Sequence, residues 1–167
     1  MERLWAPWRM EYINGIGKEE GGCIFCAKPA EQKDETNLIL HRGQHVFILL
    51  NAYPYSNGHL LVAPYRHTGE LTELAPEEAQ ELLAATMLGM RTLREAMRPD
   101  GFNVGMNLGR VAGAGIADHL HLHLVPRWGG DTNFMTVCGG TKVIPEALSV
   151  TYHKLRQALA AREAGDA

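Results

Sequence analysis

The chain has 167 residues, of which 46% are hydrophobic, and this is enough apolar material for one globular domain with a core of ordinary size. Its 16 lysines and arginines stand against 19 acidic residues, which gives a formal net charge of −3. This balance argues against a protein that binds nucleic acid or a membrane surface by electrostatic attraction, although it is compatible with a local site for a small anionic ligand.

Residues 1–22 are expected to form an N-terminal arm. They combine charged residues with the aromatic stretch 4–13, and they lack the continuous apolar run of a secretory signal or a membrane-spanning segment. We therefore expect a cytoplasmic protein. The arm, with Trp5 and Trp8, would pack either on the body of its own subunit or on a partner subunit.

Three cysteines are too few for a disulfide framework, and their odd number would leave one of them unpaired. Two of them form Cys23-x-x-Cys26, a spacing that both zinc sites and redox motifs use. As part of a zinc site, this pair needs two more ligands from elsewhere in the chain. Cys138 is interpreted as a small hydrophobic residue.

Three strands are predicted at residues 38–41, 45–50 and 59–62, where aliphatic residues dominate or alternate. The link between the last two contains Pro54 and Asn57-Gly58, which are typical of a tight reversal. Because such short links cannot form the crossover that parallel strands need, these strands are expected to form an antiparallel meander.

A helix is predicted from Pro76 to about Met97, since a proline and two acidic residues favour its N-terminus. A strand at 102–107 and a glycine-rich loop at 108–115 follow, and a second helix should run from near Pro145 to about Arg162. This order predicts an α+β fold with helices packed against an antiparallel sheet. We expect one domain made of the arm, a motif-bearing core at 23–130 and a C-terminal segment at 131–167.

Three histidines alternate with leucines in the stretch 119–125. On a strand, His119, His121 and His123 would share one face, and such a row of groups suits nucleophilic attack, acid–base chemistry or metal binding. Residues four apart on a strand are separated by roughly 13 Å, whereas a zinc–imidazole bond measures about 2.1 Å, so one metal is not expected to bind all three. The alternative is a half-buried amphipathic strand that is merely rich in histidine.

The loop before this stretch carries glycines at 109, 113 and 115. Glycines let backbone amides approach an anion closely, and such amides bind phosphate without net positive charge. The position of the loop beside three histidines favours a phosphate-binding interpretation.

The alternating histidines, followed by Leu124 and Val125, resemble the His-φ-His-φ-His-φ-φ motif of the histidine triad (HIT) superfamily of nucleotide hydrolases and transferases. The resemblance extends from about residue 20 to 130. Three stretches are most similar to the bacterial diadenosine tetraphosphate phosphorylase branch, namely residues 50–55, 101–105 and 128–131 continuing to 139–140.

The resemblance implies that His121 attacks the α-phosphorus of a nucleotide and that water or phosphate resolves the nucleotidyl-histidine intermediate. It assigns His123 to the phosphate and to the leaving group, and Asn51 to the ribose, although a turn cap is the alternative for Asn51. Phosphate oxygens would be bound by Asn107, Gly113 and Gly115. Many relatives carry a serine near Gly115, and its absence here leaves the leaving group without that hydroxyl.

The resemblance also implies a structural zinc ion held by two cysteines and two histidines, here Cys23, Cys26, His67 and His119. His59 would support the triad by hydrogen bonding, and the remaining histidines outside the motifs would be surface or satisfied polar residues: His41, His45 and His153. Relatives usually form two-fold dimers, so we expect a homodimer or a higher homo-oligomer. Two alternatives stay open: a nucleoside phosphoramidase and a non-catalytic, nucleotide-binding zinc module.

Overall fold

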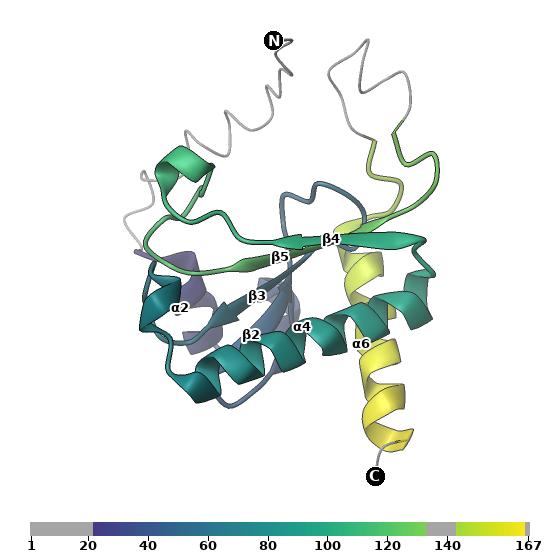
Figure 1. Cartoon of the computed structure of the whole chain (residues 1–167). Coiled ribbons are helices and arrows are strands. Elements are labelled where there is room, and N and C mark those ends of the chain that lie inside the picture. Colours follow the sequence, from purple (N-terminus) through teal and green to yellow (C-terminus); the bar gives the residue numbers. More distant parts are fainter. Residues whose placement is uncertain (1–21, 133–142, 166–167) are drawn as a thin grey trace, which may run out of the picture.

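The computed structural model describes residues 22–132 and 143–165 (Figure 1). The predicted N-terminal arm, apart from Gly22, and Cys138 lie outside these residues, so the expectations about them stay predictions. The described residues form an antiparallel sheet with helices on both of its faces, which confirms the predicted α+β fold.

The sheet has five strands in the spatial order β1-β2-β3-β5-β4. The first three form the meander that the short links predicted, and the strands are β1 (Ile39–Arg42), β2 (Val46–Leu50) and β3 (Leu60–Pro64). The last two are β4 (Gly101–Gly105) and β5 (Leu122–Arg127). Because β5 pairs with both β3 and β4, the strand that carries His123 lies inside the sheet and β4 forms its edge.

Two long helices pack beside the sheet, α4 (Pro76–Met97) and α6 (Leu148–Gly165). α4 begins at the predicted Pro76, where the Glu78 carboxylate accepts the Ala75 backbone N–H at 2.8 Å. α6 begins three residues after the predicted Pro145. The short elements are α2 (Ile24–Ala30), α3 (Asp34–Asn37) and the 3₁₀ turns Leu71–Glu73 and Arg110–Ala112. None of these described helices is both long enough and apolar enough to span a bilayer.

The strands bury side chains on both faces of the sheet. One face packs against α4 and α6, and this larger cluster includes Val46, Ile48, Leu50, Leu60, Val62, Leu82, Leu93, Leu124, Leu155 and Leu159. The other face packs against α2, and its cluster consists of Phe25, Ile39, Phe47, Leu49, Leu61 and Ala63. The histidines of the triad belong to this second face, because the Phe25 ring of α2 contacts two of them.

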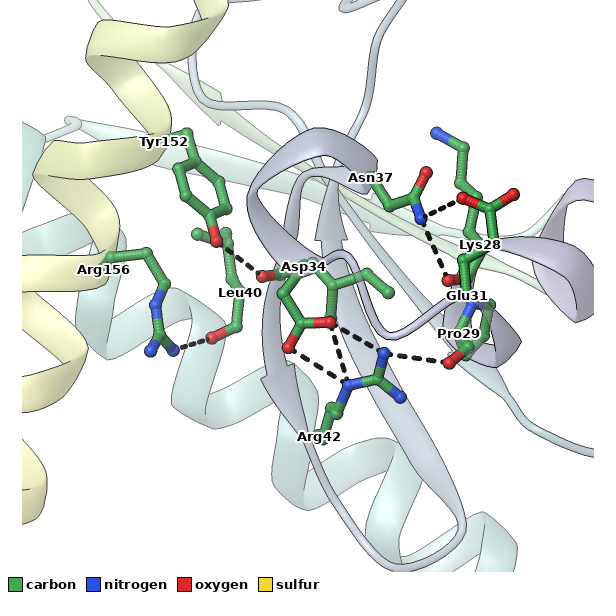
Figure 2. A network of polar contacts seen from close by, with 10 residues as sticks. Lys28, Pro29, Glu31, Asp34, Asn37, Leu40, Arg42, Tyr152 and Arg156 are labelled. Carbon is green, nitrogen blue, oxygen red and sulfur yellow. Dashed lines mark hydrogen bonds and ion pairs between the residues drawn. The ribbon is translucent and has the colours of Figure 1, made fainter.

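Polar contacts fix the segment that carries α2 and α3 against the sheet (Figure 2). Arg42 of β1 donates to both carboxylate oxygens of Asp34 and to the Pro29 carbonyl, while the Asn37 amide donates to the Lys28 carbonyl at 3.1 Å. These bonds hold the C-terminal end of α2 at one edge of the sheet. The N-terminal turn of α2 is thereby directed toward the histidines.

The edge strand β1 is covered by side chains of α6 (Figure 2). The Tyr152 hydroxyl donates to the Ile39 carbonyl at 3.1 Å, and the Arg156 guanidinium donates to the Leu40 carbonyl. The register of β1 shifts between Ile39 and His41, which turns backbone groups out of the ladder. This edge is therefore capped by the chain itself.

Candidate active site and metal-ligand cluster

The histidine stretch is not a strand along its whole length. β5 begins at Leu122, so His119 and His121 lie in the irregular segment that leads into it, and only His123 lies within the strand. The Leu120 N–H donates to the Thr68 carbonyl at 2.7 Å, and this bond draws the segment toward the loop after β3. The prediction that the three histidines form one row on a strand is therefore wrong. The ring centroids of His121 and His123 are 5.0 Å apart, whereas the ring of His119 contacts that of His67.

A hydrogen bond at one ring nitrogen of His121 fixes its tautomer. Its Nδ1 lies 2.9 Å from the His119 carbonyl oxygen, and because a carbonyl only accepts, Nδ1 carries the proton. Burial lowers the pKa of His121 below its ordinary value, against the opposing effect of this hydrogen bond. A neutral imidazole in this tautomer has its lone pair on Nε2, which is the form that a histidine nucleophile requires.

A chain of hydrogen bonds also sets the tautomer of His123. His59 is fully buried, and its Nδ1 accepts the backbone N–H of Tyr55 at 3.1 Å, so its proton lies on Nε2. That nitrogen lies 3.0 Å from His123 Nδ1 and donates to it. Neutral His123 therefore carries its own proton on Nε2, where it is a hydrogen-bond donor suited to a phosphate oxygen.

Burial, together with the smaller effects of the nearby His123 and His121, lowers the pKa of His59 to about 3. An unfolded histidine has a pKa of about 6.5, so between these two values the unfolded chain binds a proton that the folded chain does not. The free energy of unfolding should therefore fall as the pH falls from 6.5 toward 3. His59→Gln should flatten this fall by up to about 1.4 kcal/mol per pH unit.

Urea titrations at several pH values measure this slope. The matched control is His45→Gln, which changes the histidine that directly precedes β2, at the end of the β2–β3 pair away from His59. A wild-type slope that His59→Gln leaves unchanged would contradict the assignment of this pH dependence to His59.

The predicted ribose and phosphate ligands lie around these histidines. The Asn51 Oδ1 accepts the backbone N–H of Tyr53 at 2.9 Å, and Asn51 Nδ2 lies 3.2 Å from His59 Nδ1. The side chain therefore closes the turn after β2, and its contact with a ribose stays a prediction. Asn107 Nδ2 lies 3.5 Å from the Gly113 carbonyl oxygen, at the outer limit for a hydrogen bond.

The glycine loop needs glycine for its backbone conformation. Gly109 and Gly113 have φ values of +80° and +94°, and a Cβ atom added at either would meet nothing within 4 Å. The requirement is thus conformational rather than steric. Gly115 lies at the end of this loop, and it is partly buried. Binding of phosphate by these residues stays a prediction.

Four candidate metal ligands from three distant segments converge. The ligand atoms of Cys23, Cys26, His67 and His119 all lie within 4.8 Å of one another. The two imidazole Nδ1 atoms are 3.2 Å apart, and three sulfur–nitrogen distances are 3.3, 3.4 and 3.5 Å. Tetrahedral zinc with bonds of about 2.3 Å to sulfur and about 2.1 Å to nitrogen requires about 3.4 Å between two nitrogens and about 3.6 Å between sulfur and nitrogen, so these four distances are close to those that the ion needs.

The surroundings of the cluster orient its ligands. His119 Nε2 lies 2.8 Å from the Pro64 carbonyl oxygen and donates to it, which leaves the Nδ1 lone pair directed at the cysteines. The loop that carries His67 is anchored next to it by Arg66, which donates to the Glu78 carboxylate. Burial raises the pKa of the Cys26 thiol, and the neighbouring Cys23 raises it further. Both effects disfavour the thiolate, so two thiolates at this spacing require a nearby cation to stabilise their charge.

The sequence did not assign roles to two aromatic residues that lie at this site. Phe25 stacks on His121 with ring centroids 4.8 Å apart, and Tyr55 stacks on His123 at 5.6 Å. Their positions between ligand cysteines and in the loop before His59 were visible in the sequence. Their contacts depend on tertiary packing, which no local pattern reports.

The HIT domain model matches residues 32–130 of this chain. Among curated relatives, an AP-4-A phosphorylase from Mycobacterium tuberculosis is 45% identical over 157 residues, which cover 90% of this chain and 80% of that protein. Cys23 and Cys26 precede the residues that the HIT domain model matches.

Among solved structures, a zinc-bound histidine triad family protein from Mycobacterium smegmatis is similar with a TM-score of 0.71 and 28% identity, covering 86% of this chain and 97% of its own. A HIT family member from Bacillus subtilis has a TM-score of 0.59 and 26% identity, covering 86% of this chain and 96% of its own.

Proposed function

The chain belongs to the HIT domain family, and from this membership we propose that it is an enzyme that cleaves dinucleoside polyphosphates such as diadenosine tetraphosphate. The observation that carries the proposal is the tautomer of His121, whose proton is held by the His119 carbonyl so that Nε2 has the lone pair. The 45% identity to an AP-4-A phosphorylase supports the choice of substrate class.

In the proposed first step, His121 Nε2 attacks the α-phosphorus of one nucleotide half. An N–P bond forms while the bond from phosphorus to the bridging oxygen breaks, and that oxygen leaves with the other nucleotide. In the second step, water or inorganic phosphate attacks the same phosphorus and releases His121. Water would release a proton to the solvent as it attacks, whereas phosphate would attack through an anionic oxygen, and the histidine ends the cycle neutral, as it began.

The departing phosphate oxygen would leave as an anion, and the hydrogen bond that stabilises its charge is assigned to His123. Its Nε2–H follows from the chain of bonds through His59, and His123 adjoins His121 along the same face of the sheet. Gly115 stands where many relatives carry a serine, and it has no hydroxyl to take this role. Backbone amides near Gly113 would bind the non-bridging phosphate oxygens, where negative charge develops.

Incubation with diadenosine tetraphosphate tests this function. If phosphate resolves the intermediate, ADP and ATP should form in equal amounts, and only when inorganic phosphate is present. AMP and ATP without phosphate would assign the enzyme to hydrolysis. If the protein instead cleaves an adenosine phosphoramidate and leaves the dinucleotide intact, it is a phosphoramidase. Binding without turnover of either substrate would leave a nucleotide-binding module.

The four-residue cluster would hold zinc in a structural role. Cys23, Cys26, His67 and His119 would fill all four positions of a tetrahedral ion and would leave no coordination position for substrate. The ion would tie the turn before α2 to the segments that carry the two histidines. Because this cluster needs reduced thiols, it also supports a cytoplasmic location.

We also propose a homodimer formed along β4. This strand is the sheet edge opposite to the one that Tyr152 and Arg156 cap, and Val104 on it is 47% exposed. Antiparallel pairing of two such edges would continue the sheet across a two-fold axis.

Val104→Lys should weaken the dimer at least about tenfold, because a two-fold axis brings like charges together at the edge. The matched control is Val150→Lys, which changes a valine of similar exposure, 51%, on α6. Light scattering across a dilution series measures the association. A monomeric wild type, or an unchanged dimer in Val104→Lys, would refute an interface at β4.

A further inference from the structure

Phe25 lies in the first turn of α2, between the two cysteines of the metal-ligand cluster. Its side chain is 1% exposed and is therefore shielded from solvent. Its ring stacks on His121 with centroids 4.8 Å apart and planes 28° from parallel, and it also contacts His119 at 5.2 Å. One ring therefore touches both a candidate metal ligand and the candidate nucleophile.

The orientation of an imidazole is fixed by two torsions, and the hydrogen bond from His121 Nδ1 to the His119 carbonyl restrains the ring at one point only. Rotation about the axis through this bond would still move Nε2. The stacked Phe25 ring restrains that rotation, because a parallel aromatic contact is lost when either plane turns. The direction of the Nε2 lone pair thus depends on Phe25.

We propose that Phe25 is a positioning residue that holds the His121 ring in its attacking orientation. The inference rests on the proposed function of His121 as a nucleophile. Phe25 is itself fixed through its neighbours, since Cys23 and Cys26 are joined to His119 and His67 at the cluster. Attack at phosphorus needs close alignment, and a misplacement of about 1 Å can cost about 100-fold in rate.

The test compares Phe25→Leu with Phe47→Leu. Phe47 belongs to the same core cluster and is also fully buried, and it stacks on Tyr65 with ring centroids at 5.2 Å rather than on a histidine. Both variants replace a buried ring by a smaller apolar side chain, so both should lose thermal stability to a similar extent. Zinc content is measured in each, so that a lost ion is recognised.

We expect Phe25→Leu to lower kcat for diadenosine tetraphosphate about tenfold while KM stays within twofold of the wild type. Phe47→Leu should leave both constants within twofold. A kcat of Phe25→Leu equal to that of Phe47→Leu would overturn the proposal. So would a raised KM with unchanged kcat, because Phe25 would then act on the substrate rather than on His121.

A second measurement needs no substrate. In histidine-labelled protein loaded with zinc, the Nδ1–H signal of His121 should be protected from exchange with water in the wild type and in Phe47→Leu. In Phe25→Leu it should exchange at least about tenfold faster. Equal exchange in all three proteins would contradict the proposal. If the wild type fails to cleave the dinucleotide, the proposed function falls, whereas this comparison still decides the role of Phe25.

Discussion

His121→Asn is expected to lower kcat for dinucleoside polyphosphate cleavage by at least about 10⁴-fold, because it removes the group that is proposed to form the covalent intermediate. Asparagine suits this test because its amide nitrogen can still donate to the His119 carbonyl that now accepts from His121 Nδ1. The buried position thus keeps its hydrogen bond and loses only the nucleophilic nitrogen. Binding of the nucleotide should persist, since the predicted phosphate and ribose contacts come from other residues.

The control for this variant is His153→Asn, the same substitution at a half-exposed histidine on α6 that faces Glu35. It should leave kcat within twofold of the wild type. Circular dichroism and thermal unfolding show whether each variant is folded. A folded His121→Asn protein that retains more than a few per cent of the wild-type kcat would remove His121 from the role of nucleophile.

Removal of zinc is expected to have the second-largest effect. Metal analysis of the purified protein should find one zinc ion per chain. An ion that binds only the folded state stabilises it by about 4 kcal/mol when its free concentration is 1,000 times the dissociation constant. Chelation should therefore lower the free energy of unfolding by several kcal/mol, and Cys26→Ser should do the same by removing one of four ligands.

Cys138→Ser is the matched control, because it removes the one cysteine that does not belong to the predicted ligand set. Its zinc content and its free energy of unfolding in urea should equal those of the wild type. Protein prepared with ample zinc that contains none, or that loses no stability on chelation, would contradict a structural ion at this cluster.

Much of the fold could be predicted because its signals are local. The alternation of aliphatic residues located β2, and Pro76 with its acidic neighbours located the start of α4. The position of β4 at the sheet edge could not be predicted, since pairing partners are set by the whole tertiary structure. The strand character of His119 was wrong for a related reason: the bond from Leu120 to the Thr68 carbonyl overrides the local pattern.

The candidate site, too, could be predicted from the sequence only in part. The resemblance of the motifs selected Cys23, Cys26, His67 and His119 from the sequence, and the structure brings these four side chains together. The direction of the His121 and His123 protons was beyond the sequence, because it follows from a carbonyl and from a backbone N–H that only the folded chain places beside the rings.

The proposed mechanism depends most on a covalent bond between His121 and an adenylyl group. Wild-type protein mixed with diadenosine tetraphosphate in the absence of inorganic phosphate, quenched in alkali and analysed by mass spectrometry, should gain the mass of one adenylyl group. Peptide mapping should locate this group on His121, and His121→Asn should gain nothing. Rapid turnover with no adduct on the millisecond timescale, or an adduct on any other residue, would contradict a mechanism through an adenylyl group on His121.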